Sequence, residues 1–550
     1  MASDTLAHPT LRRTLRGRPS AKAIQYRNLK YASIPGRWKD SIPNDTIGAS
    51  TEGIFDATSF GPSCPHKRGA QAWDLTLVGN VQMPLQEGHM AEEETMDEFE
   101  CLTVNVTVPK MAARERDGGG KGLPVFVWVH GGGLSVGSNS WPQYDLTRFV
   151  ERSVEIGKPI VALSINYRLG ILGFLASQEL GIEGNFGYKD QILAFGWIKR
   201  HIAGFGGDPN NVTAAGESAA GISLSTLLCA DVGREGLFER VVIMSGEATL
   251  RKSRNRAWHE SMYHDQLKLL GLEGVSTQKR KSRLQKMNVD EMMNKLPLSQ
   301  HFCASVDGKF LRGDITLGVL SDGTRREHKP DWCKEFVVGD TAHDGTILKA
   351  RMLDNPNTFS LLQSLCAQHL TRSEITSLLS AYDLPASSPS QQQHSLLMLA
   401  SELRFYLPTL AVHMGWKSTT PPKNCRRYHF HVSNPVEGLY KGLASHELDV
   451  GFLFGNFHDS LDRKSKEVGK QMADQWIRYV NGDGWCEAGK VLVIGETGVV
   501  EVEEAEYDAN YRNGRGKVLE RIGTERLWRL AEGWQGVRSE EFDKNPKASL

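Results

Sequence analysis

The chain has 550 residues, of which 65 are Lys or Arg, 65 are Asp or Glu, 40% are hydrophobic and 24% are charged. This composition is that of an ordinary globular protein with a large core, and its balanced charge excludes a nucleic-acid binder that depends on a surplus of basic residues. At about 150 residues per domain, length alone predicts three or four domains, although α/β folds also run longer as one unit.

No stretch of the sequence is apolar and long enough to be predicted as a transmembrane segment. The best candidate, residues 161–176, is interrupted by Asn166 and Arg168, whereas about 18 uninterrupted apolar residues are needed. The N-terminal stretch is rich in arginine but has no hydrophobic signal region, so we expect a cytoplasmic protein, with a mitochondrial transit peptide as the weaker alternative. Eight cysteines without a C-x-x-C pair predict neither a structural zinc site nor a disulfide-built scaffold.

Short apolar runs alternate with longer amphipathic stretches along most of the chain. The runs that predict strands are residues 103–108, 125–129, 160–165, 212–215, 240–244, 336–338, 428–432 and 491–494. The stretches that predict helices are most evident at residues 188–202, 219–230 and 465–479. Nearly continuous apolar runs are typical of strands that are buried on both faces of a parallel sheet. The alternation therefore predicts an α/β fold, with a large, mostly parallel central sheet and helices on both faces.

A glycine-rich loop follows the predicted strand 125–129, where the sequence reads His130-Gly131-Gly132-Gly133. Successive glycines let backbone N–H groups turn toward an anion, because no Cβ blocks the approach or the positive φ values. The pattern is typical of the oxyanion-hole loop of lipases and esterases. Alone, it also fits a flexible loop or a phosphate-binding turn, although Val136 breaks the dinucleotide-binding pattern G-x-G-x-x-G.

A candidate nucleophile follows the predicted strand 212–215. The sequence Gly216-Glu-Ser218-Ala-Ala220-Gly221 leads into an apolar helix pattern, and a serine on such a strand–turn–helix elbow has an exposed hydroxyl near the helix N-terminus. Ala220 stands where the usual G-x-S-x-G motif has its last glycine. An ordinary strand-to-helix turn is the alternative for this segment taken alone.

Six motifs in order resemble the type-B carboxylesterase/lipase family, which includes the cholinesterases. They are HGGG at 130–133, SINYRLG at 164–170, GNFG at 184–187, DQ at 190–191, FGGDP at 205–209 and GESA at 216–219. The resemblance implies an α/β-hydrolase fold with long insertions, and a Ser-His-acid triad at the bottom of a gorge that acts on carboxylic esters.

The catalytic acid is expected between the serine and the histidine, which is the chain order of this fold. The loop GDTAHDGT at 339–346 resembles the family's acid loop, and the resemblance places the carboxylate at Asp344. Many members have Glu there, so the shorter Asp requires a closer approach to the histidine. Asp340, nearer the end of the strand, is the alternative, and a purely structural turn aspartate is another.

The catalytic base must be chosen among seventeen histidines. A serine hydroxyl needs an imidazole to take its proton and a carboxylate to orient that imidazole. The segment GLASHELD at 442–449 resembles the family's histidine loop and follows a predicted strand, which favours His446. His343, one residue from the acid, and His458, beyond the motif, are the rivals.

Further residue roles follow from the resemblance and from the motifs. The resemblance implies that Glu217 and Ser245 support the triad through buried polar contacts, whereas the glycine loop and the serine elbow themselves predict that the amides of Gly132, Gly133 and Ala219 hold the oxyanion. For Glu217 and Ser245, simple turn and strand-end positions are the alternative. The resemblance also implies that Cys64 and Cys101 match the cysteines of the family's first disulfide, which a reducing compartment would keep open.

The combined motifs predict a serine carboxylesterase that acts through an acyl-enzyme on a small-molecule ester, without cofactor or metal. An acyltransferase or a metabolite-tailoring hydrolase with the same machinery is the main alternative, and a non-catalytic partner-binding relative is the weaker one. Trp73 lies too early in the interval before Cys101 to match the cholinesterases' choline site, so a cholinesterase is disfavoured. We expect the substrate pocket near Leu134 and residues 302–310. Since the triad must converge, we expect one catalytic domain over residues 51–550, with residues 1–50 as an irregular segment packed on it.

Overall fold

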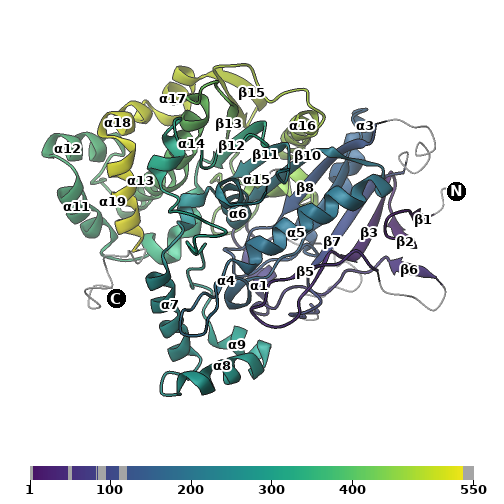
Figure 1. The fold of residues 1–550 in the computed structure, drawn as a ribbon. Coiled ribbons are helices and arrows are strands. Elements are labelled where there is room, and N and C mark those ends of the chain that lie inside the picture. The colour runs from purple at the N-terminus through teal and green to yellow at the C-terminus, as the bar shows by residue number, and fades with distance from the viewer. Residues whose placement is uncertain are drawn as a thin grey trace.

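A computed structural model describes residues 4–47, 53–81, 83, 94–110, 121–233 and 235–536 of the chain (Figure 1). Within these residues, the largest element is a 13-stranded sheet in the order β1-β2-β3-β7-β9-β8-β10-β11-β12-β13-β14-β15, with β6 paired to β2. Its strands are β1 (Thr5–His8), β2 (Arg13–Pro19), β3 (Ala23–Lys30), β6 (Ile54–Ala57), β7 (Thr103–Pro109), β8 (Leu123–Val129), β9 (Val161–Ile165), β10 (Gly207–Glu217), β11 (Arg240–Met244), β12 (Glu335–Thr341), β13 (Asn424–Phe430), β14 (Lys490–Gly495) and β15 (Gly498–Glu503). A separate two-stranded sheet pairs β4 (Ala32–Ser33) with β5 (Ile42–Pro43).

The centre of the sheet is parallel and its two sides are antiparallel. Strands β9, β8, β10, β11, β12, β13 and β14 pair in parallel. Strands β1, β2, β3, β7 and β9 pair antiparallel on one side, and β14 and β15 do so on the other. The carboxyl ends of the parallel strands meet along one edge of the sheet, which is where α/β proteins place their ligand sites.

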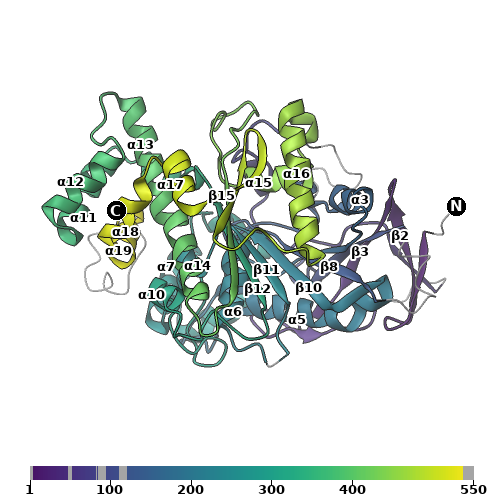
Figure 2. The same cartoon turned by 90° about the horizontal axis from the view of Figure 1, so that it is seen from above.

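Helices cover both faces of this sheet, as Figure 2 shows for α3 and α16 on one side and α5 and α6 on the other. Side chains of β8 alternate between two hydrophobic cores: Val127 belongs to the core that includes residues of α5 and α6, and Trp128 to the core that includes residues of α3, α15 and α16. Parallel strands that are buried on both faces give this pattern because successive side chains point to opposite faces. The predicted α/β-hydrolase architecture, with a large mixed sheet and helices on both faces, is confirmed.

The helices fall into those that flank the sheet and those inserted after its strands. Flanking the sheet are α3 (Thr147–Glu155), α5 (Phe186–His201), α6 (Ala219–Cys229), α14 (Leu407–Lys417), α15 (Leu448–Phe454) and α16 (Arg463–Val480). The remaining α-helices are α1 (Ala70–Leu75), α4 (Gly170–Phe174), α7 (Arg256–Leu269), α8 (Thr277–Lys286), α9 (Val289–Lys295), α10 (Leu317–Ser321), α11 (Thr358–His369), α12 (Arg372–Ala381), α13 (Pro389–Ser401), α17 (Glu504–Arg512), α18 (Arg515–Ile522) and α19 (Thr524–Gln535). Residues of α11, α12, α13, α18 and α19 share a third hydrophobic core at one end of the molecule (Figure 1).

The N-terminal segment differs from the sequence prediction of an irregular stretch over residues 1–50. Strands β1, β2 and β3 extend the central sheet, and β3 pairs antiparallel with β7. The prediction was wrong because β2 carries Arg13, Arg16 and Arg18 in seven residues. A strand on the antiparallel side of a sheet tolerates such polar positions, whereas the apolar runs used to find strands mark only the parallel centre.

One helical stretch in the described part of the chain is long and apolar enough to cross a membrane. It runs over Pro389–Lys417, has a mean hydropathy of 1.2 in its most apolar window, and is 83% buried inside the protein there. Burial at this level is typical of a core helix. This stretch differs from residues 161–176, the most apolar region found in the sequence, which here form β9 and α4.

Candidate active site

Ser218 occupies a strained turn between β10 and α6. Its backbone has φ 55° and ψ −122°, a combination that non-glycine residues rarely adopt and that is expected of a nucleophile elbow. The turn is held by a hydrogen bond from the Ser218 N–H to the Met244 carbonyl at 2.9 Å. A Cβ on Gly246 would lie 2.1 Å from the Ser218 carbonyl oxygen, so this close approach of two backbones requires glycine.

Ala220, the departure from the usual motif, fits the elbow because of its neighbours. It is fully buried, and a Cβ on Gly216 would lie 2.6 Å from the Ala220 Cβ. Gly221 takes the tighter position, since a Cβ there would lie 2.4 Å from the Gly246 carbonyl oxygen. The methyl group of Ala220 therefore uses space that Gly216 leaves free.

The glycine loop after β8 opens into the same cavity as Ser218. Gly132 and Gly133 have φ values of 96° and 61°, and both line the cavity together with Ser218 and His446. A Cβ on Gly132 would lie 2.2 Å from the Val136 carbonyl oxygen. Ala219 begins α6 directly after the serine, so its N–H belongs to the first turn, where helix amides lack internal partners.

Asp344 and His446 lie side by side in the loops that follow β12 and β13. His446 Nδ1 is 2.6 Å from Asp344 Oδ1, and the second carboxylate oxygen accepts a hydrogen bond from the Thr341 N–H at 2.8 Å. The two loops are joined by the His343 N–H, which donates to the Ala444 carbonyl at 3.0 Å. Both side chains are buried, so the carboxylate can fix the orientation and tautomer of the imidazole.

The alternative acid and the rival bases have other partners. Asp340 Oδ1 lies 2.5 Å from His429 Nδ1, so it pairs with a histidine that does not line the cavity. The His343 Nδ1 accepts a hydrogen bond from the Ala444 N–H at 3.0 Å and ties the acid loop to the base loop. His458 lies beyond α15, with its Nδ1 3.2 Å from the Gly455 carbonyl.

The cavity above Ser218 has a volume of about 360 Å³. Its wall includes residues near Leu134, as predicted, namely Ser135 and Val136, but the other predicted segment, 302–310, does not line it. Residues 298, 299 and 301 line it instead, whereas Phe302, which is 6% exposed, packs in the core. Trp73 lies on the wall although its sequence position matched no cholinesterase tryptophan.

Several buried carboxyl groups surround His446, and sequence reasoning missed most of them. Burial and the neighbouring carboxyls of Glu447 and Asp449 raise the pKa of Glu217 well above its usual value. Burial raises the pKa of Asp74 to about 6 and that of Asp449 to about 7. Glu447 accepts a hydrogen bond from the Tyr144 hydroxyl at 2.8 Å. Glu447 and Asp449 stand in the histidine motif, so their position in the sequence could have indicated that they lie near His446. Asp74 comes from a distant helix, and no motif indicates its role.

Glu217 and Ser245, the two expected supporting residues, both line the cavity. Glu217 Oε1 lies 3.0 Å from His446 Nε2, yet neither atom makes a well-aligned hydrogen bond to any residue that the structure describes. The Ser245 N–H donates to the Gly339 carbonyl at 2.8 Å, while its buried hydroxyl has no partner within the described ranges. The imidazole nitrogen that faces Glu217 is therefore not engaged in an aligned hydrogen bond within the described residues.

Cys64 and Cys101 lie together as buried free thiols, which differs from the disulfide that the resemblance implies. A hydrogen bond with Cys64, together with burial, raises the pKa of the Cys101 thiol well above its usual value. Each sulfur also contacts backbone, since the Leu169 N–H lies 3.2 Å from the Cys64 Sγ and the Cys101 Sγ lies 3.8 Å from the Glu98 carbonyl. The neutral thiol form suits these contacts.

Glu179, Glu260 and His264 form a cluster whose ligand atoms lie within 4.8 Å of one another. Its carboxylates already accept hydrogen bonds or form ion pairs with other residues of the protein. Glu260 accepts a hydrogen bond from the Ser177 hydroxyl at 3.2 Å, and Glu179 pairs with Arg280 at 2.8 Å. The cluster lies outside the cavity of Ser218, and its geometry is explained by these contacts.

Comparison with known proteins agrees with this geometry. A sequence profile described as "Carboxylesterase family" matches residues 12–482. The chain belongs to the carboxylesterase family. Para-nitrobenzyl esterase of Bacillus subtilis is 27% identical to this carboxylesterase over 450 residues, which are 80% of this chain and 81% of the relative. Lipase 3 of Yarrowia lipolytica is 32% identical over 329 residues, but the match spans only 59% of each chain.

Solved structures share the fold of this carboxylesterase. A thermophilic PNB esterase superposes with a TM-score of 0.68 at 20% identity, over 94% of this chain and all of its own length. The carboxylesterase EST55 of Geobacillus stearothermophilus superposes with a TM-score of 0.68 at 22% identity, over 92% of this chain and 99% of its own. The predicted membership of the type-B carboxylesterase/lipase family is confirmed.

Proposed function

We propose that this chain hydrolyses carboxylic esters through an acyl-enzyme on Ser218. The observation that carries the proposal is the contact of 2.6 Å between Asp344 and His446. His446 lines the same cavity as the strained Ser218 elbow and the glycine loop. These groups have the chain order and the positions at strand ends that acyl transfer in this fold requires. Family membership supports the same reaction class.

In the first step, the Ser218 Oγ attacks the ester carbonyl carbon while His446 Nε2 takes the hydroxyl proton. The carbonyl oxygen becomes an oxyanion that the amides of Gly132, Gly133 and Ala219 hold, and each such donor contributes about 3 kcal/mol to the transition state. The imidazolium is stabilised by Asp344. Collapse of the intermediate breaks the ester C–O bond, and His446 returns the proton to the leaving alcohol.

In the second step, water takes the place of the alcohol. His446 removes a proton from the water, whose oxygen attacks the acyl carbon and forms a second oxyanion in the same loop. Collapse releases the carboxylic acid and returns the proton to the Ser218 Oγ. The buried surroundings of the triad strengthen the charge interactions during both steps, because the local dielectric is low.

Hydrolysis of p-nitrophenyl esters of increasing chain length tests this proposal. We expect Ser218→Ala to reduce kcat by about 10⁴-fold or more, since the remaining groups give only residual catalysis. His458→Ala removes a histidine that does not line the cavity and should retain turnover. Turnover by correctly folded Ser218→Ala protein above about one hundredth of the wild-type rate would contradict the proposal.

A further inference from the structure

Two arginines line the same cavity as Ser218. Arg251 ends the short 3-10 helix Ala248–Arg251, and it is half-buried. A Cβ on Gly133 would lie 3.1 Å from Arg251 Nη2, so the guanidinium lies directly against the glycine loop. Arg351 belongs to the π-helical turn Lys349–Leu353 and is exposed where it lines the cavity. The ester carbonyl and these two charges would therefore share one space.

Neither arginine has an acidic partner in the described part of the chain. Arg251 donates one hydrogen bond, from Nη1 to the Phe302 carbonyl at 3.2 Å, and Arg351 forms no ion pair with a described carboxylate. Burial and the charge of Arg351 lower the pKa of Arg251 to about 10, so it still carries its charge at neutral pH. By contrast, nearby Arg254 pairs with Glu532 at 3.6 Å.

The carboxyl groups of the cavity do not neutralise these arginines. Glu217, Glu447 and Asp74 gather around His446, and burial raises the pKa of all three. An adjacent arginine would have the opposite effect, because a positive charge favours the ionised carboxylate. The cavity therefore keeps two positive charges without an acidic partner among the described residues, and one of them, Arg251, lies against the glycine loop.

His301 lies close to the same positive charges. Burial and the charges of Arg251, Arg254, Arg351 and Arg404 lower its pKa well below the usual value. Its Nε2 atom is buried and has no hydrogen-bond partner among the described residues, although it lies in a wall of the cavity. Buried polar groups are normally paired, and this nitrogen lies without a protein partner beside the two arginines.

We propose that the cavity selects esters that carry a carboxylate or a similar anionic group, which Arg251 and Arg351 bind while the ester carbonyl lies at the glycine loop. This inference rests on the proposed ester hydrolysis at Ser218. Arginine suits the task because its planar fork of N–H groups binds a carboxylate through two parallel hydrogen bonds. The anionic group can belong to the acyl part or to the alcohol part of the ester, and both use the same chemistry.

The test compares esters that differ only in charge. For the acyl part, p-nitrophenyl hydrogen adipate is measured against p-nitrophenyl hexanoate. For the alcohol part, the hexanoate ester of a carboxyl-bearing p-nitrophenol is measured against p-nitrophenyl hexanoate. In the wild type, we expect kcat/KM for one charged ester to exceed that for the neutral ester at least about tenfold, with a ratio that falls as salt screens the charges.

Arg351→Gln and Arg251→Gln should each lower this ratio by roughly 10- to 100-fold, the size expected for loss of a charged hydrogen bond. Arg251→Lys keeps the charge but loses the fork, so it should restore part of the ratio. Lys349→Gln is the matched control, because this substitution removes the same charge from the same helical turn. The wild-type Lys349 pairs with Asp354 and does not line the cavity. The substitution should leave the ratio within about twofold of the wild type.

The outcomes separate this inference from the proposed function. One outcome is that the protein hydrolyses the neutral ester in a Ser218-dependent reaction while the ratio of kcat/KM for the charged ester to that for the neutral ester is unchanged in both arginine variants. This outcome would overturn the anionic-substrate inference alone. Absence of hydrolysis of every ester by folded wild-type protein would overturn the proposed function. Because Arg351 is exposed, its substitution should not impair folding, so the ratio remains measurable if Arg251→Gln fails to fold.

Discussion

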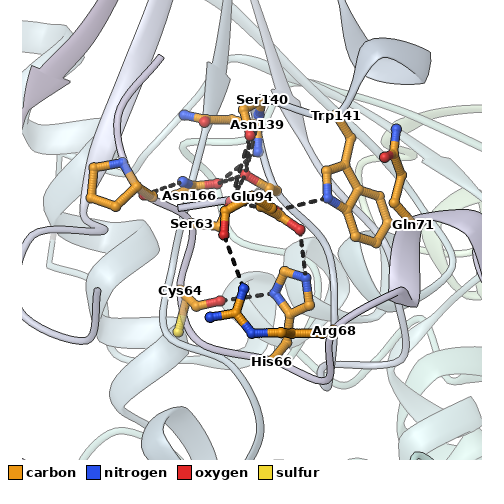
Figure 3. Close-up of polar contacts among 12 residues, drawn as sticks. Ser63, Cys64, His66, Arg68, Gln71, Glu94, Asn139, Ser140, Trp141 and Asn166 are labelled. Carbon is orange, nitrogen blue, oxygen red and sulfur yellow. Dashed lines mark hydrogen bonds and ion pairs between the residues drawn. The ribbon is translucent and has the colours of Figure 1, made fainter. Parts of the chain in front are cut away.

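Two glutamates beside histidines, Glu94 and Glu217, have opposite surroundings. Figure 3 shows Glu94 in a closed set of contacts: the Ser63 hydroxyl lies 2.6 Å and the Trp141 indole nitrogen 3.1 Å from its Oε1, and His66 Nε2 lies 3.3 Å from its Oε2. Although burial acts to raise it, the pKa of Glu94 is lowered by the contact with His66 and by hydrogen bonds from Ser63 and Trp141. Glu217, at 3.0 Å from His446, has a raised pKa and an oxygen without an aligned partner.

The difference separates a structural contact from the proposed reaction site. Glu94 joins the segment around Ser63 to Trp141 through two aligned hydrogen bonds, and His66 Nε2 lies 3.3 Å from its other carboxylate oxygen. Glu217, Ser245 and His446 Nε2 keep unused hydrogen-bonding capacity where they line a cavity. Unsatisfied buried groups are expected where a substrate will supply the missing partner.

The largest effect is expected from breaking the pair that orients His446. In Asp344→Asn, the amide keeps the shape but donates where the carboxylate accepted, so the imidazole takes the wrong tautomer. We expect kcat to fall by about 10⁴-fold with little change in KM. Steady-state kinetics on a p-nitrophenyl ester measure this loss, and a reduction of less than tenfold would show that Asp344 does not orient the base.

Glu94→Gln tests whether Glu94 stabilises the fold. Loss of a charge that buried donors use should reduce the free energy of unfolding by about 1–3 kcal/mol at pH 7. Since the folded pKa of Glu94 is lowered, its stabilising effect is present above the unfolded pKa of about 4.3 and is lost as pH falls through the folded value. Urea unfolding at several pH values should therefore show a difference in the free energy of unfolding between wild type and variant that shrinks in acid. The variant's kcat should fall far less than that of Asp344→Asn.

Glu217→Gln should give the opposite pH dependence of the free energy of unfolding. The folded pKa of Glu217 is raised, so wild-type stability is fully present below the unfolded pKa of about 4.3 and is lost as pH rises toward the folded value. The variant, which cannot ionise, should become progressively more stable than the wild type as pH rises from 5 to 7. Equal pH slopes for the two glutamine variants would remove the distinction between Glu94 and Glu217.

The motifs predicted the parts of the site that depend on local backbone geometry. The glycine loop and the Ser218 elbow require particular residues at adjacent positions, so a short segment reveals them. Asp344 and His446 were predicted by resemblance and chain order, and they meet at 2.6 Å. The parallel centre of the sheet was also predicted, because its apolar runs are unambiguous.

The missed features depend on packing between distant segments. Asp74 and Arg251 enter the cavity from elements whose positions follow from tertiary contacts, and neither stands in a motif that names its role. The N-terminal strands were missed because arginines interrupt their pattern. Residues 302–310 were predicted at the cavity, but it is the turn just before them that reaches it.

Labelling with an organophosphonate ester tests the role of Ser218 most directly. Such a reagent forms a bond to the activated serine and expels its leaving group, and peptide mass spectrometry locates the adduct. We predict one adduct per wild-type chain on the peptide that contains Ser218, strongly reduced in Asp344→Asn and absent in Ser218→Ala. Full stoichiometric labelling of Ser218→Ala, or an adduct on another residue of the wild type, would contradict Ser218 as the nucleophile.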